Sequence, residues 1–70
     1  MKSEDLYIKN IENGIRAIRM NTKKPADVGA SISAQFTKLK AVNEGMHDDL
    51  MVKYKNVVKD FNNKNQDLTN

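Results

Sequence analysis

Four isoleucines near the start of the chain repeat at intervals of three, four and three residues, at positions 8, 11, 15 and 18. This spacing places all four side chains on one face of an α-helix. Ser3 is a suitable N-cap, and Glu4 and Asp5 follow it, where carboxylates favour the positive end of the helix dipole. We therefore predict a first helix over about residues 3–21 that has one apolar face.

Gly14 lies beside this isoleucine face. A glycine inside a helix costs about 1 kcal/mol relative to alanine. Because glycine lacks a side chain, it also allows a second helix to approach closely. We expect a close contact between two helices at Gly14.

The first helix cannot continue through Pro25, because proline lacks an amide hydrogen and disfavours helical geometry in the preceding residue. A second apolar stripe follows, with a mean spacing close to one helical turn. Its members are Val28, Ile32, Phe36, Leu39, Met46, Leu50, Tyr54, Val57 and Phe61. We predict a long second helix over about residues 28–61, paired with the shorter first helix in an all-α helical hairpin.

Gly45 offers an alternative, because it could end a helix at the C′ position, with Asp48 as the N-cap of the next helix. The chain would then form a three-helix bundle broken near Gly45. The apolar stripe keeps its phase across Gly45, and this favours the single long helix. A long helix leaves apolar surface uncovered in a monomer and predicts self-association, whereas the three-helix bundle can close its own core.

The length of the chain limits it to one small core, because about 70 residues bury only about 60% of their unfolded surface. We predict a single helical domain over residues 1–61 and a polar, flexible tail over residues 62–70.

No apolar run approaches the roughly 20 residues of a membrane span. The first residues lack the basic and then apolar pattern of a signal peptide. We expect a cytoplasmic protein that does not bind membranes.

The isoleucine face and the second stripe are expected to pack together, and apolar surface beside them to mediate assembly into a homo-oligomer. Ile8 and Ile15 would occupy one core position of a heptad repeat, and Ile11 and Ile18 the other. Isoleucine at both core positions is typical of trimers or tetramers in parallel coiled coils. The predicted core and self-association residues are Ile8, Ile11, Ile15, Ile18, Ile32, Phe36, Leu39, Leu50, Tyr54 and Val57.

The net charge of +3 is mild, since twelve basic residues are interspersed with nine acidic ones. Four acid–base pairs lie at i, i+4 spacing, which stabilises helices modestly. They are Asp5 with Lys9, Glu12 with Arg16, Asp49 with Lys53, and Asp60 with Lys64. A basic cluster remains around the end of the first helix and the following loop, and it could bind DNA, RNA or another phosphate-bearing ligand. The candidate residues for an anionic partner are Arg16, Arg19, Lys23, Lys24, Lys38 and Lys40.

Residues 28–38 have the pattern of a helix-turn-helix turn followed by a recognition helix. Ser33, Gln35, Thr37 and Lys38 would then face the bases. Pro25 leaves little room for the short supporting helix, so an ordinary loop and N-cap are favoured.

Catalytic and metal-binding residues are scarce, because the chain has no cysteine and one histidine. Glu44 and His47 have the spacing with which helical bundles hold metal ions, but the motif occurs once, and a surface histidine is the favoured interpretation. Nucleophilic catalysis needs an activated pair in a pocket, for which so small a core has little room. We expect no cofactor, no metal and no enzymatic activity.

These observations predict a small non-catalytic helical interaction module that self-associates. It would act as a regulator, inhibitor or adaptor by binding a protein or a small ligand. The alternative is a small DNA- or RNA-binding regulator that uses the basic cluster. Frequent lysine, asparagine and isoleucine are typical of AT-rich coding sequences and suggest a phage or mobile-element origin.

Overall fold

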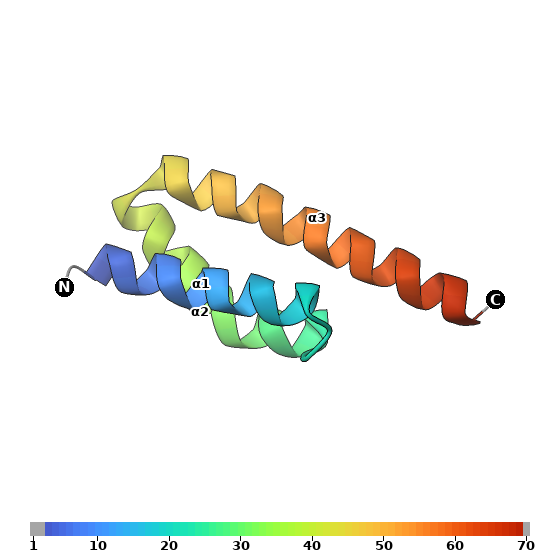
Figure 1. Cartoon of the computed structure of the whole chain (residues 1–70). Coiled ribbons are helices and arrows are strands. Elements are labelled where there is room, and N and C mark those ends of the chain that lie inside the picture. Colours follow the sequence, from blue (N-terminus) through green and yellow to red (C-terminus); the bar gives the residue numbers. More distant parts are fainter. Residues whose placement is uncertain (1–2, 70) are drawn as a thin grey trace.

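The computed structural model describes the backbone of residues 3–69 and the side chains of residues 3–64. It has three α-helices, α1 (Ser3–Arg19), α2 (Pro25–Val42) and α3 (Glu44–Thr69). The first two helices run antiparallel, and α3 returns alongside both, with its C-terminal part continuing beyond the α1–α2 loop (Figure 1). The predicted all-α class is confirmed.

The first helix ends before the expected boundary at residue 21, because Asn21 adopts a left-handed conformation with φ 60°. The amide of Asn21 donates to the carbonyl of Ile18 at 3.0 Å, and the amide of Thr22 donates to the carbonyl of Ala17 at 2.9 Å. These two bonds form a Schellman motif, which satisfies the last carbonyl groups of the helix. The turn thus begins before Pro25 is reached.

The region expected to form one helix over residues 28–61 is interrupted at Asn43, whose backbone is extended (φ −155°, ψ 86°). The amide of Asn43 donates to the carbonyl of Leu39 at 2.7 Å. Its side-chain Oδ1 accepts a hydrogen bond from the amide of Met46 at 3.0 Å. Asn43 therefore ends α2 and serves as the N-cap of α3, which asparagine does well.

The break lies two residues before Gly45, the position that sequence reasoning considered. Gly45 and Asp48 both lie inside α3, and Gly45 has no positive φ. The second helix also begins earlier than expected, at Pro25, because proline fits the first turn of a helix.

A single apolar core lies between the three helices. The buried residues are Ile11, Ile15, Ile18, Val28, Ile32, Phe36, Leu39, Leu50 and Val57. Ile8 and Tyr54 are partly buried and pack against them, so all ten residues predicted for the core lie in or against this cluster. Gly14 contacts Val28 and Ile32 of α2, which confirms the expected close approach of two helices.

The segment over residues 62–70, expected to be a flexible tail, continues α3 as far as Thr69. Its flexibility stays a prediction, and Asn70 and the side chains from residue 65 onward lie outside the described residues. Within residues 3–69, none of the helices combines the length and the apolar character needed to cross a membrane.

Candidate interaction surfaces

A groove of about 840 Å³ runs between α2 and α3, and its lining residues belong to these two helices. Its apolar residues are Ile32, Phe36, Met51 and Tyr54. Gly29 and Ala41 also line the groove, and its polar residues are Ser33, Thr37, Lys40, Glu44 and His47. A concave apolar surface with a polar margin is typical of sites that bind another helix.

Three rings of the groove form an edge-to-face cluster, a favourable arrangement for aromatic side chains. The ring centroid of Phe36 lies 5.7 Å from that of His47 and 5.8 Å from that of Tyr54. The hydroxyl of Tyr54 donates to the carbonyl of Pro25 at 3.4 Å. These contacts join the two walls of the groove, because each pairs a residue of α2 with a residue of α3.

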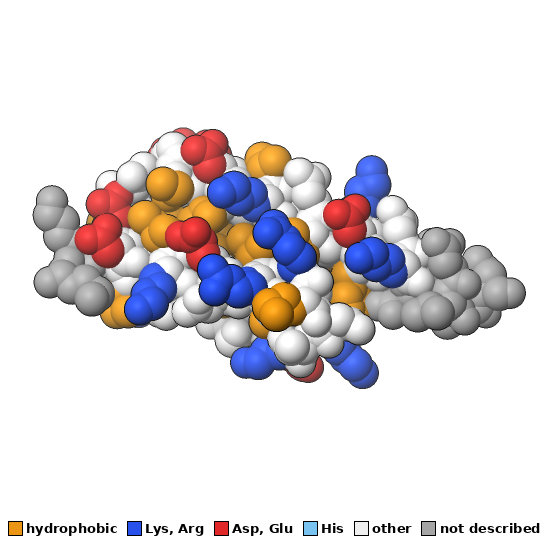
Figure 2. Space-filling model, viewed as in Figure 1, with side chains coloured by type: hydrophobic (Ala, Val, Ile, Leu, Met, Phe, Trp, Pro, Cys, Tyr) orange, Lys and Arg blue, Asp and Glu red, His pale blue; other side chains and the backbone are white. Residues whose placement is uncertain are grey.

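Acidic side chains gather at the end of the molecule where α1 begins and α2 meets α3. Asn43 Nδ2 donates a hydrogen bond to the carboxylate of Glu4, so the start of α1 lies against the α2–α3 junction. Figure 2 shows most of the red side chains of this face towards that end. The acidic residues at the starts of the two helices are Glu4, Asp5, Glu44, Asp48 and Asp49.

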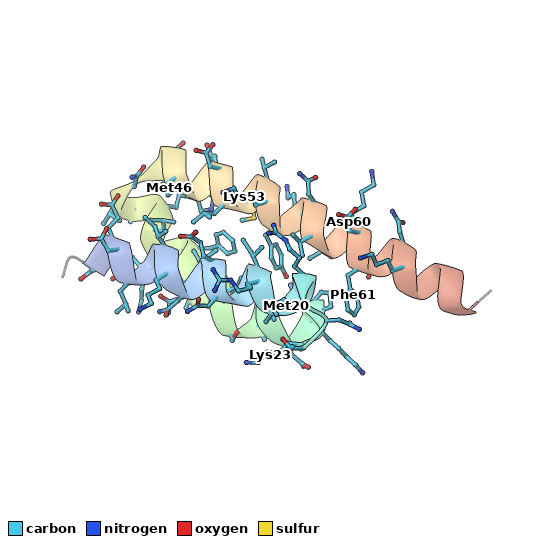
Figure 3. All side chains as sticks on the ribbon, viewed as in Figure 1. Met20, Lys23, Met46, Lys53, Asp60 and Phe61 are labelled. Carbon is cyan, nitrogen blue, oxygen red and sulfur yellow. The ribbon has the colours of Figure 1, made fainter. Side chains whose placement is uncertain are left out.

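Basic side chains surround Phe61 towards the opposite end of the three-helix core. Arg19 of α1 and Lys53 and Lys64 of α3 line one hollow of about 410 Å³ together with Phe61. Phe61 also lines a second hollow, of about 670 Å³, whose basic residues are Lys23 and Lys24 of the α1–α2 loop. Figure 3 shows Phe61 on the side of α3 that faces this loop, and Figure 2 shows blue side chains over the middle and right of the same view. Asp60 and Asp27 contribute negative charge to the two hollows.

The four acid–base pairs expected at i, i+4 spacing do not form direct ion pairs. Among the side chains of residues 3–64, the one contact within ion-pair distance joins His47 Nδ1 and Asp48 Oδ1, at 3.0 Å.

The six residues predicted for an anionic partner are all exposed, but the structure does not bring them together. Arg19, Lys23 and Lys24 lie near Phe61. Lys40 instead lines the α2–α3 groove, and Lys38 Nζ lies 5.9 Å from the centre of the Tyr7 ring. Arg16 lies on the exposed side of α1.

Sequence reasoning missed the contribution of α3 to this basic surface. Lys53, Asp60, Phe61 and Lys64 lie seven, one and three residues apart, which places them on one side of a helix. The spacing alone could have shown that these residues share one side of a helix. Only the packing of the three helices shows that this side of α3 meets the end of α1.

The helix-turn-helix interpretation of residues 28–38 is wrong, and so is the favoured alternative of a loop followed by an N-cap. These residues belong to one continuous helix, α2, and Gly29 lies inside it without a turn. Gln35, one of the side chains expected to face bases, accepts a hydrogen bond from Asn10 of α1 at 3.3 Å. The segment packs within the bundle and does not form a separate recognition helix.

Within the described part of the chain, no group of three histidine, aspartate or glutamate side chains is placed to hold a metal ion. His47 of the Glu44–His47 motif contacts Asp48 and Phe36, and its side chain is only 12% exposed, so the favoured interpretation of a surface histidine is wrong. Comparison of the chain with protein-family models, with curated proteins and with solved structures found no match.

Proposed function

We propose that this protein is a small, non-catalytic helical interaction module that self-associates through the α2–α3 groove. It acts as a regulator, inhibitor or adaptor by binding, with the assembled helices as its working surface. The observation that supports self-association is the groove itself, in which Met51 and Tyr54 remain only partly buried beside Phe36. Partly covered apolar side chains in a continuous groove favour association, because a partner helix would remove them from water.

The test is the mass of the protein in solution, measured by light scattering at several concentrations. The proposal predicts a stable multiple of the 8.0 kDa chain mass. Met51→Glu places a charge in the groove and should give a monomer with unchanged helix content. Met20→Glu is the matched control, because Met20 is also a methionine, lies outside α2 and α3, is 66% exposed and does not line the groove. A wild-type monomer at every concentration would contradict self-association.

A second candidate function is the binding of single-stranded nucleic acid at the basic surface around Phe61. Five cations from three parts of the chain surround this aromatic side chain. Lysine and arginine bind phosphates, and an aromatic ring that stacks on a base adds about 1–3 kcal/mol. A short single-stranded DNA or RNA would use both kinds of contact.

Fluorescence anisotropy with a labelled single-stranded oligonucleotide tests this second candidate. Lys53→Ala with Lys64→Ala should weaken binding and lower its salt dependence, since each lost phosphate contact reduces the slope by about 0.7. Lys38→Ala with Lys40→Ala removes the same charge away from Phe61 and should have little effect. Equal losses from the two double variants would indicate unspecific attraction by net charge and would exclude a site at Phe61.

A further inference from the structure

Four charged residues along one side of α3 are arranged symmetrically about a point in the first half of the helix. Glu44 and Asp48 lie near its start, and Lys55 and Lys59 follow at the same spacing further along. All four side chains are exposed. Positions 44 and 59 are equidistant from a point between residues 51 and 52, and so are positions 48 and 55.

The partly buried residues of the neighbouring stripe share nearly the same centre. His47, Met51, Tyr54 and Val58 follow one another at intervals of four, three and four residues. Positions 47 and 58, and positions 51 and 54, are equidistant from a point between residues 52 and 53. The two centres are one residue apart, which is about 1.5 Å along a helix and is within the reach of lysine side chains.

We infer that the partner in the groove is a second copy of this chain, with the two α3 helices antiparallel about a two-fold axis near Met51. This inference rests on the proposed self-association and adds its geometry. A two-fold axis makes each contact occur twice, so Glu44 faces Lys59 of the second copy, and Asp48 faces Lys55 of the second copy. Met51 packs on Tyr54 of the second copy at the centre.

A parallel arrangement is disfavoured by the same charges. If the two α3 helices were parallel and in register, each of the two carboxylates would face the same carboxylate of the second copy. Each of the two lysines would likewise face the same lysine. Like charges in contact suppress association. The antiparallel arrangement converts all four repulsive contacts into attractive ones. The α2 helices then flank the central α3 pair, because the groove has α2 as its second wall.

Charge reversal tests the inference. Glu44→Lys with Asp48→Lys makes the four charged positions of α3 all positive, and Lys55→Glu with Lys59→Glu makes them all negative. Each double variant should dimerise at least tenfold more weakly than the wild type, while an equimolar mixture of the two should recover the dimer. The quadruple variant, with all four charges exchanged in one chain, should also recover it. Lys9→Glu with Lys38→Glu is the control, because it changes the net charge equally on exposed residues that lie outside α3.

Cross-linking provides an independent readout, because the chain has no cysteine of its own. Met51→Cys should form a disulfide-linked dimer on oxidation, since the two copies of residue 51 are offset by at most three residues along the helix, about 4.5 Å. Glu44→Cys should not, because antiparallel helices place its two copies far apart. A wild-type monomer would refute the proposed self-association. A wild-type dimer that ignores the charge reversals, or that cross-links through Glu44→Cys, would refute the antiparallel register alone.

Discussion

Gly14 of α1 lies so close to Val28 of α2 that a β-carbon built on the glycine would be 2.8 Å from Val28 Cγ1. The same atom would be 3.1 Å from Ile32 Cγ2. The two helices therefore approach each other at a point where only hydrogen fits. The isoleucines on either side of Gly14 are thereby brought into contact with α2.

We predict that Gly14→Ala lowers the free energy of unfolding. Alanine would gain about 1 kcal/mol of helix propensity, but overpacking in a close contact costs about 1–3 kcal/mol. Gly45→Ala is the matched control, because its new β-carbon would meet only Asn43 Oδ1, at 3.7 Å. Urea denaturation of both variants should show a loss for the first and no loss for the second. Stabilisation by Gly14→Ala would show that α1 and α2 do not approach as closely as described.

Asn43→Ala should destabilise the protein by about 1 kcal/mol, the usual contribution of an N-cap side chain. The variant loses the hydrogen bond to the amide of Met46 and the one to Glu4. Asn43→Ser keeps an acceptor for the helix amide and should retain most of the stability. Thermal unfolding followed by circular dichroism measures both, and equal melting temperatures for the two variants would exclude a capping role.

Gly29→Ala and Tyr54→Phe should be coupled. A β-carbon at Gly29 would lie 2.7 Å from the hydroxyl oxygen of Tyr54, so Gly29→Ala alone forces the tyrosine to move. Tyr54→Phe removes that oxygen at the cost of the 3.4 Å hydrogen bond to Pro25. The double variant should therefore lose less stability than the sum of the single losses. A double-mutant cycle by denaturation checks this, and simple additivity would mean that the two residues do not touch.

Asn21→Ala should destabilise the turn after α1 by about 1 kcal/mol, because most L-residues are strained in the left-handed region. Asn21 has φ 60°, and its amide and that of Thr22 close the Schellman motif. Asn21→Gly should match or exceed the wild type, since glycine adopts this conformation without strain. The order of the three melting temperatures is the test, and a higher value for alanine than for glycine would contradict the turn geometry.

The sequence was informative about the fold wherever one helical face is apolar. The spacing of Ile11, Ile15 and Ile18 identified the first helix and its buried side, because burial demands that periodicity. The junction at Asn43 was missed because the apolar stripe keeps its phase across it. Asn43 is nevertheless a stronger N-cap than Gly45, and Glu44 follows it in the first turn, where a carboxylate favours the helix dipole.

The candidate surfaces were harder to anticipate than the core, because each depends on two elements meeting in space. The basic surface joins Arg19 of α1 to Lys53 of α3, residues that are distant in sequence. The groove depends on the packing of Tyr54 against the start of α2, next to Gly29. Local periodicity contains no information about either pairing.

The junction at Asn43 also bears on how this chain could evolve. Because the apolar stripe runs in phase through the junction, the same residues are compatible with three short helices or with one long helix after α1. The difference lies in the backbone torsions of a single residue, whose side chain stabilises the bent form. A straightened junction would leave a core that only a second chain can complete, as in exchange of identical segments between subunits. One substitution at this position is therefore a short mutational route between a self-contained subunit and an intertwined one, with the core sequence unchanged.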